Sequence, residues 1–403
     1  MTDSTLGAVS ATAITNTRVF DGHSLSAPTT VVIQPDGRIG DVSADAVVVG
    51  AAVVNAEGTV LLPGLIDCHM HLKGRESLET LATYGVTTGL DMATWPASQF
   101  QSLRGLRGVA DFRTAGMAAT SQGSTHSRIP TYPDVALVDS PDKAERFVEV
   151  QVADGVDYIK IIADLPGPTQ DVLDALVAAA HARGLKVIAH AALYEAVRMS
   201  LAAGADMITH APLDRALDDA TAETMLAQGT VFIPTLTMMK GIAANLTAAG
   251  VPGVSYAHAH ESTRAMHAAG VPVLAGTDAG TDAYVESLTR ASPPYGESTR
   301  AMHAAGVPVL AGTDAYIESL TRALPPYGES MHDELALLVD AGLSTAEALR
   351  AATSTAAHAF SLDDRGAITP GLRADLVLVD GDPLTDIAAA RRVLRVWCGG
   401  IEV

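Results

Sequence analysis

The chain has 403 residues, of which 48% are hydrophobic and only 4% aromatic, and its formal net charge is −20. This length exceeds a single small domain and allows a large core built from aliphatic side chains. The negative charge excludes nucleic acid as an expected partner, because its phosphates would be repelled.

The two cysteines, Cys68 and Cys398, exclude a disulfide framework and fit a reducing compartment. Residues 1–10 contain neither a basic start nor an apolar run, so no signal peptide is expected. The apolar run 47–54 is too short to span a bilayer. We therefore expect a soluble, cytoplasmic protein with no membrane partner.

Both ends of the chain have the pattern of small β units. Residues 11–60 alternate short apolar runs with turn residues, and two further strand-like runs lie at 374–380 and 393–397. Neither unit could bury both of its faces alone. We expect residues 1–60 and 363–403 to pair as one small β-sandwich domain, with residues 61–362 forming a second domain between them.

The middle of the chain repeats one pattern: a helical stretch ends in glycine, and an apolar strand follows. Glycine adopts the left-handed conformation that ends many helices. The glycines are Gly85, Gly155, Gly184, Gly204, Gly229 and Gly270. Alternating strands and helices indicate a parallel sheet. Strands are expected near residues 62, 86, 113, 158, 187, 207, 232 and 273. About eight strands favour a (β/α)8 TIM barrel, with a doubly wound open sheet as the alternative.

A tandem duplication interrupts this pattern. Residues 261–279 recur letter for letter at 297–315, which defines two helix–strand–loop cassettes at 261–296 and 297–328. An eight-stranded barrel has no ninth position. One copy must therefore lie outside the barrel, or the sequence is irregular here.

Polar side chains stand at the expected strand ends. The apolar run 61–66 is expected to form one buried strand. It ends in His-x-His, whose two imidazoles project from the same face of that strand. Since the carboxyl ends of parallel barrel strands share one edge, such side chains would converge. The convergent set is His69, His71, Lys160, His190, His210 and Asp278. Its nitrogen and oxygen atoms suit zinc or a similar divalent ion.

Each member has a plainer interpretation when taken alone. A strand-end histidine is often a hydrogen-bonded core group, Asp278 could cap a helix, and Lys160 could snorkel to solvent. The duplication also offers Asp314 in place of Asp278; the full-length helix expected at 256–269 favours Asp278. His126, in a Gly/Ser-rich loop, could contact substrate or face solvent. The histidines of helical stretches are expected at the surface: His181, His258, His260, His267, His303, His332 and His358.

The sequence resembles the metal-dependent amidohydrolase superfamily over nearly its whole length. The resemblance rests on these stretches: 63–71, 158–162, 187–190, 207–210, 276–278, 341–353 and 371–379. The lysine at residue 160 is similar to that of the branch containing prolidase-like dipeptidases, ochratoxinase and phenylurea hydrolases. The family is built on a barrel that holds metal at its mouth.

This resemblance implies two divalent metal ions, usually zinc, bridged by N6-carboxylated Lys160. His69, His71 and Asp278 would hold one ion, and His190 and His210 the other. A metal-bridging hydroxide would attack an amide, peptide, urea or carbamate carbonyl of a small molecule. The catalytic aspartate would pass the proton to the leaving nitrogen, and His126 could stabilise the oxyanion.

Two other functions stay open. A mononuclear ring hydrolase or deaminase, similar to imidazolonepropionase, would require an acidic partner near His190 instead of Lys160. A non-catalytic barrel scaffold would bind no metal. Metal content near two, one or zero ions per chain separates the three. The substrate is not predictable from the loops, and a homo-oligomer stays open because relatives often assemble.

Overall fold

The computed structural model describes residues 11–47, 49–129, 131–279 and 325–403. Asp314, His303 and nearly all of the second cassette lie outside these residues, as does the end of the first cassette. Asp278 lies within them.

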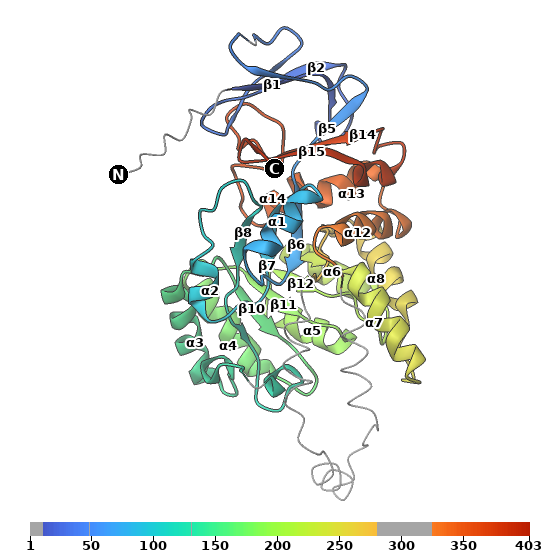
Figure 1. The fold of residues 1–403 in the computed structure, drawn as a ribbon. Helices are drawn as coiled ribbons and strands as arrows, with labels where there is room; N and C mark the ends of the chain where they lie inside the picture. Colours follow the sequence, from blue (N-terminus) through green and yellow to red (C-terminus); the bar gives the residue numbers. More distant parts are fainter. Residues whose placement is uncertain (1–10, 48, 130, 280–324) are drawn as a thin grey trace, which may run out of the picture.

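Strands from both ends of the chain form one sheet, at one end of the molecule in Figure 1. Its strands are β1 (Thr12–Val19), β2 (Thr29–Ile33), β3 (Ile39–Ser43), β4 (Ala52–Asn55), β5 (Thr59–Pro63), β14 (Leu376–Asp380), β15 (Val393–Cys398) and β16 (Ile401–Glu402). β5 pairs antiparallel with β14, with Leu62 opposite Val377. Ile14, Leu61 and Trp397 are buried in one cluster beneath it. The two termini therefore share a hydrophobic core, although the expected domain boundaries stay a prediction.

The remaining strands form two parallel sheets. They are β6 (Leu65–Met70), β7 (Val86–Asp91) and β8 (Asp111–Thr114) in one sheet, and β9 (Ala118–Ala119), β10 (Ile159–Ile162), β11 (Val187–His190), β12 (Met207–Thr209) and β13 (Val231–Ile233) in the other. Every pairing in both sheets is parallel. The fold is therefore mixed α/β, as the alternating pattern predicts.

Helices lie between these strands along the chain and surround them in Figure 1. They are α1 (Arg75–Thr83), α2 (Ala97–Gln101), α3 (Pro141–Asp154), α4 (Gln170–His181), α5 (Tyr194–Ala202), α6 (Asp219–Gln228), α7 (Leu236–Ala248), α8 (Tyr256–Ala269), α12 (Glu329–Asp340), α13 (Thr345–Ala351) and α14 (Ser354–Ala359), with 3-10 turns η1 (His126–Arg128), η2 (Asp134–Ala136) and η3 (Ile387–Arg391). All six predicted stop glycines have positive φ. Among the described helices, none is long and apolar enough to cross a membrane.

The prediction of one continuous strand over residues 61–66 is wrong, because the run is divided between β5 and β6. Leu62 and Leu65 belong to two strands in different sheets, and the chain passes from one sheet to the other at Gly64. The Gly64 amide donates to the Asp375 carbonyl at 2.8 Å, and a Cβ at Gly64 would lie 2.1 Å from the Thr87 hydroxyl oxygen. Only glycine allows the chain to pass so close to β7.

The stretch around Val273 lies between β13 and β6. Val273 forms a parallel bridge with Phe232, and Ala279 forms one with Met70. The Cys68 amide also donates to the Ala275 carbonyl at 2.9 Å. Residues 271–279 thus contact the edge strand of each parallel sheet, β13 through Val273 and β6 through Ala279.

One surface histidine is predicted wrongly. His332 is only 5% exposed, and its Nε2 lies 3.0 Å from the Tyr84 carbonyl oxygen. Apolar neighbours on α12 such as Leu335 are buried with it, because α12 packs against α7 and α13. The other described helical histidines are half-buried or exposed.

Candidate metal centre

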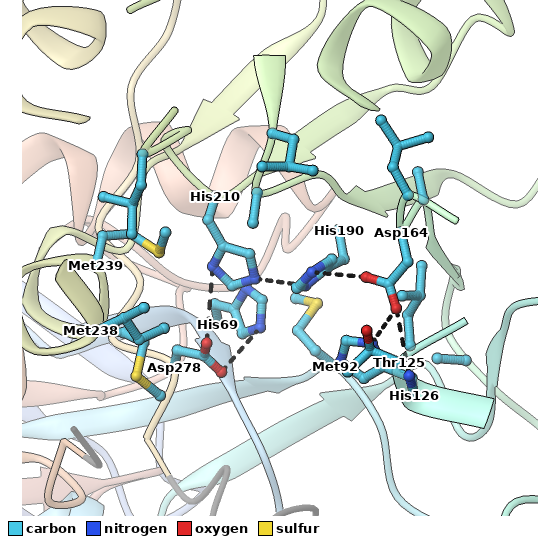
Figure 2. A pocket seen from close by; sticks show the side chains of 18 of the residues that line it. His69, Met92, Thr125, His126, Asp164, His190, His210, Met238, Met239 and Asp278 are labelled. Carbon is cyan, nitrogen blue, oxygen red and sulfur yellow. Dashed lines mark hydrogen bonds and ion pairs between the residues drawn. The ribbon is translucent and has the colours of Figure 1, made fainter. Parts of the chain in front are cut away.

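His69 and His71 converge on Asp278 at the carboxyl end of β6. The Nε2 atoms of His69 and His71 lie 3.4 and 3.1 Å from the Asp278 Oδ1 atom, and Figure 2 shows His69 and Asp278 facing each other. All three side chains are buried. The first part of the predicted ligand set is therefore brought together.

The buried carboxylate of Asp67 fixes the segment that carries Asp278. It accepts hydrogen bonds from the Thr277 amide at 3.0 Å and the Thr277 hydroxyl at 2.6 Å. The Asp278 amide in turn donates to the His69 carbonyl at 2.7 Å. No sequence pattern predicts this role of Asp67, because a single aspartate within an apolar run carries no signal of its partner 210 residues away.

Glycine at position 276 permits this approach. A Cβ there would lie 2.7 Å from Ile233 Cγ2 and 2.9 Å from His69 Cβ. These separations are shorter than contacts between carbon atoms allow. The Gly276-Thr277-Asp278 sequence therefore combines a close backbone approach, a hydroxyl for Asp67 and a carboxylate for the site.

His190 and His210 lie beside the first group. His190 ends β11 and His210 directly follows β12; the His210 Nε2 and His190 Nδ1 atoms are 2.9 Å apart. The His210 Nδ1 atom lies 3.8 Å from Asp278 Oδ2, and the His69 and His210 ring centroids are 4.7 Å apart. The four predicted histidines and Asp278 thus form one continuous cluster, as Figure 2 shows for four of these five residues.

Lys160 faces the same cavity from β10. It is 3% exposed, and its Nζ atom donates to the Thr209 hydroxyl at 3.3 Å. Burial lowers the pKa of Lys160 to about 7, although the nearby Asp278 and Asp91 oppose this shift. The side chain does not snorkel to solvent, and its burial favours the neutral amine.

Asp164 links His126 to His190 on the other side of the cavity. His126 Nδ1 lies 2.7 Å from Asp164 Oδ2, and His190 Nε2 lies 3.7 Å from Asp164 Oδ1. Burial acts to raise the pKa of Asp164, but His126 and His190 hold it well below its ordinary value. His126 lines the cavity, and 24% of its side chain is exposed. Asp164 is absent from the predicted ligand set, although residues 160, 162 and 164 alternate onto one face of an extended strand.

The donor set fits a divalent metal ion. Ligand atoms of His69, His71 and Asp278 lie within 4.8 Å of one another, and so do those of His126, Asp164 and His190. Burial lowers the pKa of His69, His190 and His210 well below the ordinary value. Neutral imidazoles offer the lone pairs that metals bind. The buried Nδ1 atom of His69 has no hydrogen-bond partner among the described residues.

Comparison with known proteins identifies the family. The model of the family described as "Amidohydrolase family" matches residues 60–403. The chain belongs to the amidohydrolase family. An uncharacterised protein of Mycobacterium tuberculosis is 30% identical over 268 residues, which cover 61% of this chain and 70% of that protein. A shorter match, 45% identical over 65 residues, is to the imidazolonepropionase of Deinococcus deserti and covers 15% of this chain and 16% of that enzyme.

Solved structures of this family share the fold over nearly the whole chain. A putative prolidase from Bifidobacterium longum is 25% identical with a TM-score of 0.76, covering 98% of this chain and 95% of that one. Phenylurea hydrolase B is 22% identical with a TM-score of 0.75, covering 98% of this chain and 96% of that one. The likeness to the second structure concerns the fold alone.

Proposed function

We propose that this amidohydrolase-family protein hydrolyses a C–N bond of an amide, peptide, urea or carbamate at a two-metal site. The observation that carries the proposal is the convergence of His69, His71, His190, His210, Asp278 and Lys160 on one cavity. His69, His71 and Asp278 would hold one ion, His190 and His210 the other, and a carboxylated Lys160 would bridge them. Zinc is the metal expected from the nitrogen and oxygen donors.

We further propose that the two parallel sheets close into a (β/α)8 barrel within residues 61–362, next to the β-sandwich domain of residues 1–60 and 363–403. The bridges from Phe232 to Val273 and from Met70 to Ala279 support closure on one side. Successive pairings of β8 with β7 and of β9 with β10 support it on the other. The cavity would then lie at the carboxyl ends of the strands, where barrel enzymes carry their sites.

Bound divalent ions supply Lewis acidity, which makes water more acidic and a carbonyl more electrophilic. The chain supplies the proton transfers. Asp278 lies against three imidazoles. Its backbone amide donates to the His69 carbonyl, and Asp67 holds the adjacent Thr277. Its carboxylate takes a proton from the attacking water and delivers it to the leaving nitrogen. His126, held by Asp164, donates a hydrogen bond to the substrate carbonyl oxygen.

The test combines metal analysis with a substrate screen. We expect near two ions per chain and hydrolysis of at least one member of a panel of N-acyl amino acids, Xaa-Pro dipeptides, aryl amides and phenylureas. Chelation should abolish this hydrolysis, and zinc should restore it. Hydrolysis that persists in the metal-free protein would contradict the proposal.

The second candidate is a mononuclear ring hydrolase or deaminase. It is favoured by Asp164, an acidic partner 3.7 Å from His190. Glu195, the first acidic residue after His190 along the chain, lies in the first turn of α5 and pairs with Arg198. The short imidazolonepropionase match supports it as well. Lys160 beside the same histidines favours the two-metal proposal. One ion per chain and turnover of a cyclic amide or amidine would decide for the second candidate.

A further inference from the structure

The cavity next to the metal centre has one apolar wall. The cavity measures about 430 Å³, within the usual range for small-molecule sites. Its wall comes mainly from α7 and the loop that follows. The apolar lining residues of this wall are Met238, Met239, Ile242, Leu246, Val251 and Val254. In Figure 2, Met238 and Met239 lie on the side of Asp278, away from Asp164.

Hydrogen bonds to α12 fix the position of α7 on the side away from the cavity. The buried Glu334 carboxylate of α12 accepts hydrogen bonds from the Leu236 amide at 3.0 Å and the Thr237 amide at 2.8 Å. Both amides belong to the first turn of α7, whose amides have no partners within the helix. The wall is therefore a supported part of the fold, and methionine side chains on it can adapt to flat or branched groups.

The mouth of the cavity is apolar as well. Leu165, Leu193 and Val251 line it and are 41%, 36% and 36% exposed. They come from three separate loops: after β10, before α5 and after α7. Large apolar side chains exposed together at a cavity mark a binding surface for apolar groups.

The charges along the cavity disfavour an acidic substrate. Among the described lining residues, Lys160 is the only lysine or arginine, and it lies at the metal centre with its amine on Thr209. The carboxylates of Asp164 and Asp214 also line the cavity. A substrate carboxylate against the α7 wall would be desolvated without a cationic partner among these residues, which is costly.

We propose that the site takes an uncharged substrate: an aryl or alkyl amide, urea or carbamate whose apolar group packs on α7 and carries no carboxylate. This inference rests on the proposed function and narrows its substrate class. Dipeptides and N-acyl amino acids would be poor substrates. Sulfur atoms of Met238 and Met239 favour contact with an aryl ring.

Matched substrate pairs test the inference. Acetanilide is compared with 4-acetamidobenzoate, and 1,1-dimethyl-3-phenylurea with its 4-carboxyphenyl counterpart, using the metal-loaded protein. We expect kcat/KM to be higher for the neutral member by about tenfold or more, since the carboxylate stays unpaired. Equal or faster turnover of the carboxylated member would overturn the inference.

Variants of the wall give a second, independent measurement. Ile242→Lys places a cation on the half-buried face of α7, and Val251→Lys places one at the exposed mouth, where folding is least affected. Either should shift the ratio about tenfold toward the carboxylated member, while Ile242→Leu should keep the wild-type ratio. An unchanged ratio in a folded Val251→Lys protein would count against the inference.

Failure of the proposed hydrolase function can be distinguished from failure of this inference about substrate charge. If the metal-loaded protein hydrolyses neither member, calorimetric titration with the same pairs still measures which one it binds. Tighter binding of the neutral member would uphold the apolar site without the hydrolase. Equal or tighter binding of the carboxylated member, or no binding of the neutral one, would reject the inference.

Discussion

At the scale of single residues, two carboxylates outside the proposed ligand set hold the ligand residues in position. Asp67 fixes Thr277 and the backbone of His69, whereas Asp164 contacts His126 and His190. A hydrogen bond at one imidazole nitrogen sets the tautomer and directs the other nitrogen to the metal. The His190 Nε2 atom faces Asp164, which leaves its Nδ1 atom directed at His210.

Asp164→Asn should therefore weaken metal binding at the His190–His210 pair. The neutral amide removes the negative charge 3.7 Å from the His190 Nε2 atom, so we expect a loss of about 10–100-fold in affinity for one of the two ions. Competitive chelator titration measures this loss, and Asp214→Asn, which alters another carboxylate of the same cavity, is the matched control. Identical affinities in the two variants would refute the role of Asp164.

A second prediction concerns His332, which is far less exposed than its helical position suggests. Burial lowers its pKa from 6.5 to about 4. Between these values the unfolded chain binds more protons than the folded one, so acidification through this window destabilises the protein. The slope is about 1.4 kcal/mol per pH unit for one proton.

Replacing the imidazole should remove this pH dependence. His332→Gln keeps a donor for the Tyr84 carbonyl but cannot titrate. Urea unfolding at pH 4.5 and 7 should show a smaller difference in the variant than in the wild type. His358→Gln, at an exposed helical histidine, is the control. Equal pH dependence in all three proteins would be incompatible with a buried neutral His332.

At the scale of elements, the periodic features of the sequence are predictable, and the exceptions occur where distant segments meet. Stop glycines and the alternation of strands and helices depend on local conformation, and both are confirmed. The break at Gly64 depends on Thr87, and the burial of His332 depends on Tyr84. Neither contact has a local signature, so the sequence alone suggests one continuous strand and a surface histidine.

The Gly276 contact gives a prediction at this scale. Gly276→Ala should displace the segment 276–278 from β6, because the new methyl group would overlap Ile233 and His69. We expect a loss of stability of about 1–3 kcal/mol and weaker metal binding, measured by thermal unfolding with and without zinc. Gly74→Ala, where a Cβ meets open space, should have neither effect; the account fails if the two variants behave alike.

At the scale of the whole molecule, the chain ends are tied to the parallel sheets by a buried arginine. Arg365 is 6% exposed, and its guanidinium lies 2.8 Å from Oδ2 of Asp111, the first residue of β8, and 2.7 Å from Asp364 Oδ1. It also donates to the Thr88 hydroxyl of β7 at 3.0 Å. The motifs at strand ends indicated the candidate site, whereas this link between chain regions 277 residues apart could not be predicted.

Arg365→Met should destabilise the whole protein. It leaves Asp111 and the buried Asp375 with fewer cationic neighbours, which costs about 3–5 kcal/mol when a buried pair is broken. Guanidinium unfolding measures the loss. Arg395→Met, which breaks an exposed pair with Glu402, should change stability by less than about 1 kcal/mol. A comparable small loss in both variants would contradict a structural role for Arg365.

The most direct test of the metal centre is the metal content and hydrolytic activity of Lys160→Ala beside those of the exposed-site control Lys143→Ala. The account predicts near two ions per chain in the wild type and the control. It predicts fewer ions and no detectable hydrolysis in Lys160→Ala, because the buried amine that would bridge the ions is gone. Full activity with an unchanged metal content in Lys160→Ala would contradict it.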